Sequence, residues 1–356
     1  MAPSAQAELK KQYVSSDKAP TKKPMEPRPS ASILLISPIN QILLLHRVRR
    51  KSDAFAAAHV FPGGNLSASQ DGDIPAPDHP QRHVDGPAYR LGAIRECFEE
   101  SGILLAKKND GSGSLLEVPE TEKNRARKEI HSGKLKFVDW VKTQGGVVDS
   151  DSLLPYTRWI TPTNVPKRFT TQMYIYFLPL QTTSISSLGL PITSEAMIPI
   201  PTSDGGIEHT AALFQSCSQW LSQAAQNEII LFPPQFYLMY LLSPFLQASE
   251  APTALSVEEL QKQRDYVIEF LKTDGDGKGV LWKDKVMSPM GLGGFSKDGR
   301  AILALDKPGP ELKASGRRGD ERRVVLVKFG KQGPRDVEVR LRAEVLAEQR
   351  EGASKL

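Results

Sequence analysis

A short acidic run close to residue 100 constrains the fold of this chain more than any other feature. Residues 95–103 read Arg-Glu-Cys-Phe-Glu-Glu-Ser-Gly-Ile. Because an α-helix turns by about 100° per residue, Glu96, Glu99 and Glu100 would lie within about 100° of arc on one face. Apolar residues at helical spacing mark a second face, namely Leu91, Ile94, Phe98 and Leu105. We therefore expect a helix over about residues 88–105 that buries one face and gathers carboxylates on another.

The gathered carboxylates suggest a metal site. Like charges repel one another at this spacing, and a hard divalent cation relieves the repulsion; oxygen ligands suit Mg²⁺ or Mn²⁺. Such a cation neutralises charge on a phosphate group and lowers the pKa of a bound water. Arg95 can orient Glu96 or bind phosphate through its planar guanidinium. We predict Glu96, Glu99 and Glu100 as metal ligands, although a bare cluster of this kind is more often a solvated helix face.

The residues around the cluster follow a stricter pattern than the glutamates alone. In chain order the pattern consists of Gly63-Gly64, Arg95-Glu96, Glu99-Glu100 and Gly102-Ile103, with an apolar slot at Cys97. In these residues the chain resembles the Nudix hydrolase family. The resemblance implies an α/β fold, the Nudix α/β/α sandwich with a mixed sheet. It also implies an enzyme that hydrolyses a pyrophosphate, a phosphorus-containing acid anhydride, with Arg95 and Glu96 in catalytic roles.

One stretch departs from the family pattern. Gln70 stands where the family has a glutamate, and residues 65–94 separate the glycine pair from Arg95, about seventeen residues more than the pattern has. Either Asp71 or Asp73 can take the place of that glutamate. The missing residue belongs to a loop and helix start in the family, so its loss bears on loop geometry more than on the reaction.

The long segment itself points to one branch of the family. It resembles the peroxisomal coenzyme A and acyl-coenzyme A diphosphatases, and further segments similar to that branch are residues 58–64, 159–162, 168–169 and 231–237. The resemblance implies that water cleaves the pyrophosphate of coenzyme A or acyl-coenzyme A. The products would be 4′-phosphopantetheine, or its acyl form, and adenosine 3′,5′-bisphosphate. The base that deprotonates the water would be Glu96 or Glu208, and Glu208 could also be a fourth metal ligand.

Basic residues before the glycine pair are candidates for binding the substrate. Arg47, Arg49 and Arg50 can attract the phosphates of coenzyme A, and Gly63 and Gly64 complete the predicted substrate-binding set. The coenzyme A signature of related enzymes is matched only in part, because an alanine at position 57 stands where a glycine is expected. A solvated basic loop is the alternative. Aromatic residues expected mostly in the core, although one could stack on adenine, are Trp159, Phe169, Tyr174 and Tyr176.

Two other functions remain compatible with the sequence. The first is a peroxisomal Nudix activity on NADH or ADP-ribose, which needs no pocket for a 3′-phosphate. The second is a degenerate Nudix domain that binds nucleotides without cleaving them. The intact arginine, glutamates and glycine of residues 95–102 argue against the second.

Changes in composition divide the chain into segments. Residues 1–29 are polar and rich in Lys and Pro, and we expect a disordered tail there. Residues 30–250 form the predicted Nudix domain, with an inserted loop at 65–87, and residues 255–350 form a C-terminal β-rich extension. Strands are expected over 32–37, 41–48, 158–162 and 170–178, and helices over 137–143, 209–225, 236–246 and 257–271.

Composition and the last residues bear on the cellular context. The net charge of +5 is mild and no basic stripe is interleaved with aromatics, so nucleic acid is not an expected partner. No run approaches the roughly 18 apolar residues of a membrane span. Cys97 and Cys217 form no visible disulfide framework, so we expect a reducing compartment. The sequence ends in Ser354-Lys355-Leu356, which the peroxisomal import receptor reads, so we expect a protein of the peroxisomal matrix.

Overall fold

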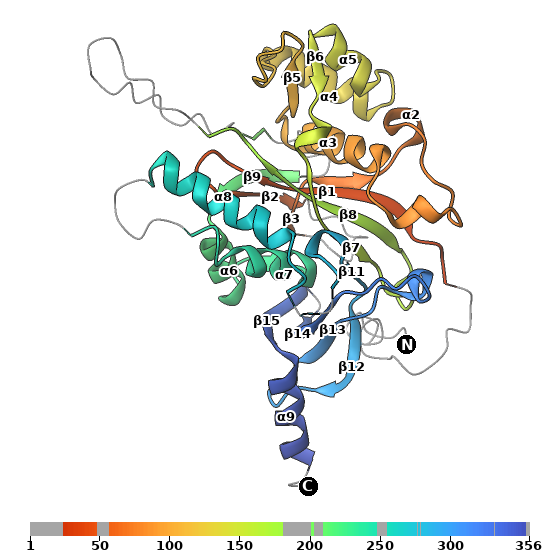
Figure 1. Cartoon of the computed structure of the whole chain (residues 1–356), viewed down its shortest axis with the longest axis vertical. Helices are drawn as coiled ribbons and strands as arrows, with labels where there is room; N and C mark the ends of the chain where they lie inside the picture. Colours follow the sequence, from red (N-terminus) through yellow and green to blue (C-terminus); the bar gives the residue numbers. More distant parts are fainter. Residues whose placement is uncertain are drawn as a thin grey trace.

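A mixed β-sheet forms the centre of the computed structural model, which describes residues 24–47, 57–180, 201–202, 209–247, 255–275, 277, 279–330 and 332–353 (Figure 1). Its strands are β1 (Arg28–Ile36), β2 (Ile42–Arg47), β3 (Ala58–Val60), β4 (Gly63–Asn65), β7 (Leu154–Ile160), β8 (Phe169–Phe177), β9 (His209–Gln215), β10 (Ile230–Leu231) and β11 (Val286–Met287). They lie in the order β10-β3-β2-β1-β8-β7-β11, with β4 paired to β1 and β9 paired to β2. Two partners therefore share one edge of β1, because β2 pairs at Ile36 and β4 pairs at Ser30 to Ser32.

Helices cover both faces of this sheet. One face carries α3 (Pro87–Ser101), with α4 (Glu120–His131) and α5 (Phe137–Thr143) beyond it, and the other carries α6 (Cys217–Ala225), α7 (Pro233–Leu242) and α8 (Val257–Leu271) (Figure 1). The predicted α/β fold, an α/β/α sandwich with a mixed sheet, is therefore confirmed. No helix in the described part of the chain is both long enough and apolar enough to cross a membrane.

The central strand shows how the two cores are built. β1 and β8 pair in parallel along their whole length, and both are rich in apolar residues, as is typical of strands covered on both faces. Side chains alternate across a strand. Ile33 and Leu35 therefore pack on the side of α3, whereas Leu34 and Ile36 pack on the side of α7.

The helix α3 is shorter than predicted. It ends at Ser101 and not at residue 105, because Gly102 adopts a left-handed conformation with φ 73° and donates its N–H to the Phe98 carbonyl at 2.9 Å. A Cβ at Gly102 would lie 2.6 Å from Thr202 Oγ1. Backbone conformation and close packing thus both require glycine at this position.

An insertion between α3 and β7 packs onto the outer face of α3. It contains α4, α5 and the short hairpin of β5 (Ala106–Lys108) and β6 (Gly146–Val148). The Phe98 ring of α3 stacks on Trp140 of α5 with centroids 4.9 Å apart. The insertion is thereby fixed beside the carboxylate helix, and α5 has the predicted bounds.

The predicted helix over 209–225 is wrong in its first half. Residues 209–215 form strand β9, which pairs antiparallel with β2 from Ile42↔Gln215 onward. A capping box of Ser216 and Gln219 then starts α6 at Cys217. The apolar residues of the strand suit either element, and pairing with β2 decides the outcome.

Two predicted loop or tail segments contain regular structure. β1 begins at Arg28, inside the predicted disordered tail of residues 1–29, because the Arg28 N–H bonds to the Arg168 carbonyl and the strand pairs with β8. The predicted loop at 65–87 contains the short helix α2 (Ala68–Asp71) and the 3-10 turn η1 (Pro80–His83).

The predicted β-rich extension is confirmed. Its antiparallel sheet has the order β12-β13-β14-β15 and is followed by helix α9; the bounds are β12 (Met290–Phe295), β13 (Ala301–Leu305), β14 (Asp320–Gly330), β15 (Gly333–Leu341) and α9 (Arg342–Ala353). Val325 and Val327 of this sheet share one buried cluster with Trp220 and Phe236 of α6 and α7. The extension is therefore joined to the sandwich through a common core.

Candidate active site

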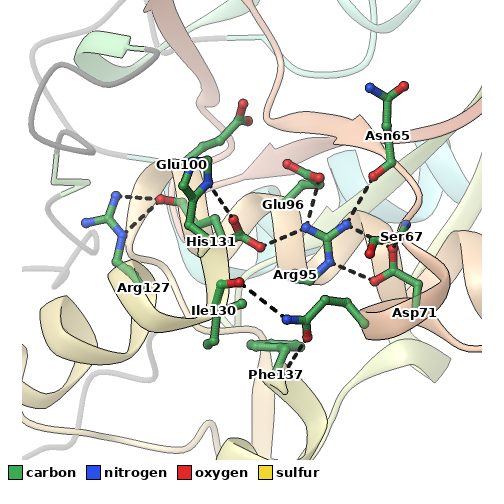
Figure 2. A network of polar contacts seen from close by, with 12 residues as sticks. Asn65, Ser67, Asp71, Arg95, Glu96, Glu100, Arg127, Ile130, His131 and Phe137 are labelled. Atoms are coloured by element: carbon green, nitrogen blue, oxygen red, sulfur yellow. Dashed lines mark hydrogen bonds and ion pairs between the residues drawn. The ribbon is translucent and has the colours of Figure 1, made fainter. Parts of the chain in front are cut away.

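Arg95, a buried residue of α3, is the centre of a polar network (Figure 2). Its Nη1 lies 2.9 Å from Glu96 Oε1 and 2.7 Å from Glu99 Oε1. On its other side Nε and Nη2 donate to the Asp71 carboxylate at 2.7 and 2.9 Å, and Nη2 also donates to the Asn65 carbonyl at 3.1 Å. Charge-assisted, bidentate bonds of this kind hold a guanidinium in one orientation. The network therefore fixes Arg95 between the carboxylates of α3 and the end of β4.

Asp71, one residue after the position where the family pattern has a glutamate, is bound to Arg95. Its side chain is buried and also accepts a hydrogen bond from the Ser67 N–H at 2.8 Å. Asp73, the alternative candidate, is exposed and two residues further along. Of the two aspartates that the sequence left open, Asp71 is the one that meets Arg95.

Gln70 has a structural role of its own. Its Nε2 donates to the carbonyls of Ile130 and Leu135, and its Oε1 accepts from the Phe137 N–H at 2.9 Å. These groups belong to the end of α4, the following turn and the start of α5. A glutamate could not donate the first two bonds. Gln70 thus joins the long segment to the α4–α5 insertion.

The glycine pair of β4 lies directly against the carboxylates. The Gly63 N–H donates to Glu100 Oε2 at 2.7 Å. A Cβ at Gly64 would lie 2.6 Å from the Glu96 carboxylate, and one at Gly63, whose φ is 155°, would lie 2.4 Å from the Ala31 carbonyl. No larger residue fits at either position without moving a catalytic candidate or the strand β1.

Burial and the neighbouring charges both affect the pKa values of Glu96 and Arg95. Burial and the neighbouring Glu99 charge raise the pKa of Glu96 to about 7, against the opposing effect of Arg95. Burial alone would lower the pKa of Arg95. Its bond to Asp71 and the charges of Glu96 and Glu99 outweigh burial and raise the pKa of Arg95 above its ordinary value. Arg95 therefore stays a cation, and a further positive charge beside Glu96 would favour its ionised form.

The donor set suits a hard divalent cation in its chemistry, since all three predicted ligands are carboxylates. Across the described residues, no three His, Cys, Asp or Glu side chains converge closely enough to hold an ion. Glu99 is held by Arg95 and by His131, whose Nδ1 lies 3.1 Å from Glu99 Oε2. Glu96 and Glu100 project from α3 in the same direction (Figure 2). These two are placed to meet a cation, and Glu99 would have to exchange a partner to join them.

The carboxylates open into a cavity of about 1010 Å³. Its charged wall contains Glu96, Glu99 and Glu100 together with residues of α4: Asn124, Arg127, Lys128 and His131. Asn124, Lys128 and His131 are exposed and recur at helical spacing, so they form one polar face of α4. Arg127 is buried and donates to the Glu99 carbonyl through Nε and Nη2, at 3.0 and 2.8 Å. The insertion thus supplies a basic wall beside the carboxylates.

The other predicted site residues have different outcomes. Arg47, Gly63 and Gly64 all line the cavity. Arg49, Arg50, Glu208 and the terminal Ser354, Lys355 and Leu356 lie outside the described residues, so their predicted roles stay predictions. Ala57, at the position where a glycine was expected, has a φ of 63°, which explains the family's preference for glycine there. Sequence reasoning missed the basic wall of α4, although the spacing of Asn124, Lys128 and His131 was a usable signal.

Comparison with known proteins agrees with this arrangement. Residues 78–242 match the family model described as the NUDT19 Nudix domain. These residues are thus similar to a Nudix domain. The chain is 26% identical to the acyl-coenzyme A diphosphatase NUDT19 of Gallus gallus over 58% of this chain and 61% of that protein, and 25% identical to that of Xenopus laevis over 59% and 61%. The predicted resemblance to the coenzyme A diphosphatase branch is thereby confirmed.

The likeness covers only part of each relative. The chain spans 43% to 61% of the length of the curated relatives that it matches. Among solved structures, a NUDIX hydrolase from Alicyclobacillus acidocaldarius matches with 21% identity and a TM-score of 0.46, over 61% of this chain and 90% of that one.

Proposed function

We propose that this protein hydrolyses the pyrophosphate of coenzyme A or acyl-coenzyme A. The products are 4′-phosphopantetheine, or its acyl form, and adenosine 3′,5′-bisphosphate. The observation that carries the proposal is the Arg95 network beside Gly63 and Gly64, which opens into a cavity with carboxylates on one wall and cations on another. The similarity to the acyl-coenzyme A diphosphatases of Gallus gallus and Xenopus laevis supports this choice of substrate.

The carboxylates of α3 prepare the attack of water on phosphorus. The water oxygen forms a bond to one phosphorus, the bridging P–O bond breaks, and the water proton passes to a carboxylate, Glu96 or Glu208. Glu96, Glu99 and Glu100 would hold Mg²⁺ or Mn²⁺, which when bound supplies charge neutralisation at the phosphates and acidifies its water. Arg95 keeps Glu96 and Glu99 in place, and Asp71 keeps Arg95 in place. The pair Arg95–Asp71 is thus a positioning device.

Cations around the cavity attract the charged half of the substrate. Lys128 of α4 is exposed and Arg47 at the end of β2 lines the same cavity. A site lined with positive charge raises the local concentration of a polyanion. Coenzyme A carries a 3′-phosphate in addition to its pyrophosphate, and these residues offer it a partner.

The test is a substrate panel with the purified chain and Mg²⁺. Coenzyme A, dodecanoyl-coenzyme A, NADH and ADP-ribose are incubated in parallel, with an EDTA control, and the products are separated and weighed by mass spectrometry. We expect the two coenzyme A substrates to yield adenosine 3′,5′-bisphosphate in a reaction that EDTA stops. Turnover of NADH or ADP-ribose alone would establish a different Nudix activity. Tight binding without turnover of any of the four would establish a nucleotide-binding protein.

A further inference from the structure

The cavity has a second, apolar part that a pyrophosphate does not need. Its volume of about 1010 Å³ lies at the upper end of the roughly 300–1,000 Å³ that encloses a drug-sized ligand. Away from the carboxylates its walls come from β7, β8 and the start of α7. The apolar residues include Trp159, Val165, Phe169, Met173, Phe232 and Pro234, and Thr161 and Lys167 also line this part. We call this part the apolar chamber.

The strand register sets the distance between the two parts. One row of paired residues crosses the sheet from Asn65 of β4 through Ser30 of β1 and Thr171 of β8 to Trp159 of β7. The Asn65 carbonyl accepts from Arg95, so the row begins at the catalytic network. Neighbouring strands lie about 4.8 Å apart, so three steps place Trp159 about 14 Å from that network. A ligand that fills both parts must therefore be long.

The chamber has fixed walls. Trp159 donates its indole N–H to Thr157 Oγ1 at 3.0 Å, and its ring packs edge-on against Tyr237 with centroids 5.9 Å apart and planes at 71°. Pro233 and Pro234 occupy the first turn of α7, where proline preorganises the helix. A rigid apolar wall selects ligands by shape, and it loses little entropy when one binds.

One polar group in the chamber has no partner. The side-chain oxygen of Gln235 is buried, and no donor within the described ranges reaches it. Gln235 lines the cavity beside Phe232 and Pro234. An unsatisfied buried amide oxygen is costly, and an N–H donor from a ligand would relieve that cost.

We infer that the apolar chamber holds the pantetheine arm and the acyl chain of the substrate, with Gln235 accepting a hydrogen bond from a pantetheine amide. This inference rests on the proposed function, because it places one half of the same substrate. The arm leaves the pyrophosphate as a long chain with amide N–H groups and continues into an apolar thioester. The bisphosphorylated adenosine half carries the charge, and the cavity offers it the cations Arg47, Lys128 and Lys167.

The two products provide separate probes of the two ends. Inhibition by 4′-phosphopantetheine and by adenosine 3′,5′-bisphosphate is measured on the whole chain and on Gln235→Leu, which keeps the size and removes the acceptor. We expect 4′-phosphopantetheine to bind about tenfold more weakly to the variant, as the loss of one buried hydrogen bond predicts. Inhibition by adenosine 3′,5′-bisphosphate should be unchanged. If the variant weakens only the adenosine product, adenosine occupies the chamber and the inference is wrong.

A second variant narrows the chamber without touching Gln235. Thr171 is half-buried on β8 and lines the cavity next to Trp159, so Thr171→Leu should reduce the kcat/KM ratio of dodecanoyl-coenzyme A to coenzyme A. An unchanged ratio in a variant with unchanged thermal melting would contradict the inference. Binding of 4′-phosphopantetheine is also measured by calorimetry, which needs no turnover. If the unmodified chain turns over no coenzyme A substrate, the proposed function fails, while the calorimetric arm still tests the chamber.

Discussion

The two ends of the cavity are built in different ways. At the charged end polar contacts hold the carboxylates of α3 through Arg95, which meets Asp71, Glu96, Glu99 and the Asn65 carbonyl. At the apolar end the walls are held by packing, and Gln235 has a polar atom without a partner among the described residues. The charged end is therefore suited to fixed chemistry, and the apolar end to choosing the ligand by shape and by a single hydrogen bond.

The largest loss of activity is expected when the buried carboxylate of Asp71 is removed from the charged end of the cavity. Asp71→Asn removes the negative charge that holds Arg95, so Glu96 and Glu99 lose their common anchor. We expect kcat/KM to fall by about 10²-fold, because small misplacements of catalytic groups cost rates of this order. Steady-state kinetics with coenzyme A measures the change.

The matched control is Asp73→Asn, two residues away and exposed. It should keep full activity, since its carboxylate does not take part in the Arg95 network. Equal losses in both variants would show that the aspartates act through general charge and not through Arg95.

A smaller loss of activity is expected when a larger side chain at Gly64 crowds the charged end of the cavity. In Gly64→Ala the new Cβ would lie 2.6 Å from the Glu96 carboxylate, so the glutamate must move. We expect roughly a tenfold loss of kcat, since the group moves but keeps its charge. The control is Gly330→Ala, where a Cβ would meet its nearest atom at 3.6 Å. If both variants keep the activity of the unmodified chain, Glu96 is not held where the account needs it.

The basic wall of α4 should affect binding more than chemistry. Lys128→Ala removes an exposed cation from the cavity. We expect KM for coenzyme A to rise roughly two- to tenfold at low salt, with kcat unchanged, and the effect to shrink as salt screens the charge. Lys134→Ala, an exposed lysine that does not line the cavity, is the control. A change in kcat without a change in KM would contradict this role.

The smallest predicted effect is a change in stability caused by substituting Ala57, the residue just before β3. Ala57 has a φ of 63°, a conformation that costs an L-residue roughly 1–2 kcal/mol and costs glycine little. Ala57→Gly should therefore raise stability by about 1 kcal/mol or less, because the greater entropy of glycine in the unfolded chain offsets part of the gain. Urea unfolding measures this difference, and a clear destabilisation would show that the left-handed conformation is not retained.

The sequence predicted what depends on short-range patterns. The helical spacing of Glu96, Glu99 and Glu100, the bounds of α5 and α8, and the strand around Thr170 all follow from local periodicity and capping. The sequence was a poorer guide to contacts between residues that lie far apart in the chain. The pairing of β9 with β2, the bond of Asp71 to Arg95 and the approach of Trp159 to the cavity depend on long-range packing, which periodicity does not encode.

The central claim is that the carboxylates of α3 cleave the pyrophosphate of a coenzyme A substrate. The most direct measurement compares initial rates on dodecanoyl-coenzyme A with Mg²⁺ for the unmodified chain, Glu100→Gln and Glu269→Gln. Glu269 lies exposed on α8, where its carboxylate pairs with Lys272 at 2.7 Å. We expect Glu100→Gln to lose about 10²-fold or more of kcat, with an unchanged melting temperature, and Glu269→Gln to keep full activity. Full activity in Glu100→Gln would contradict the account.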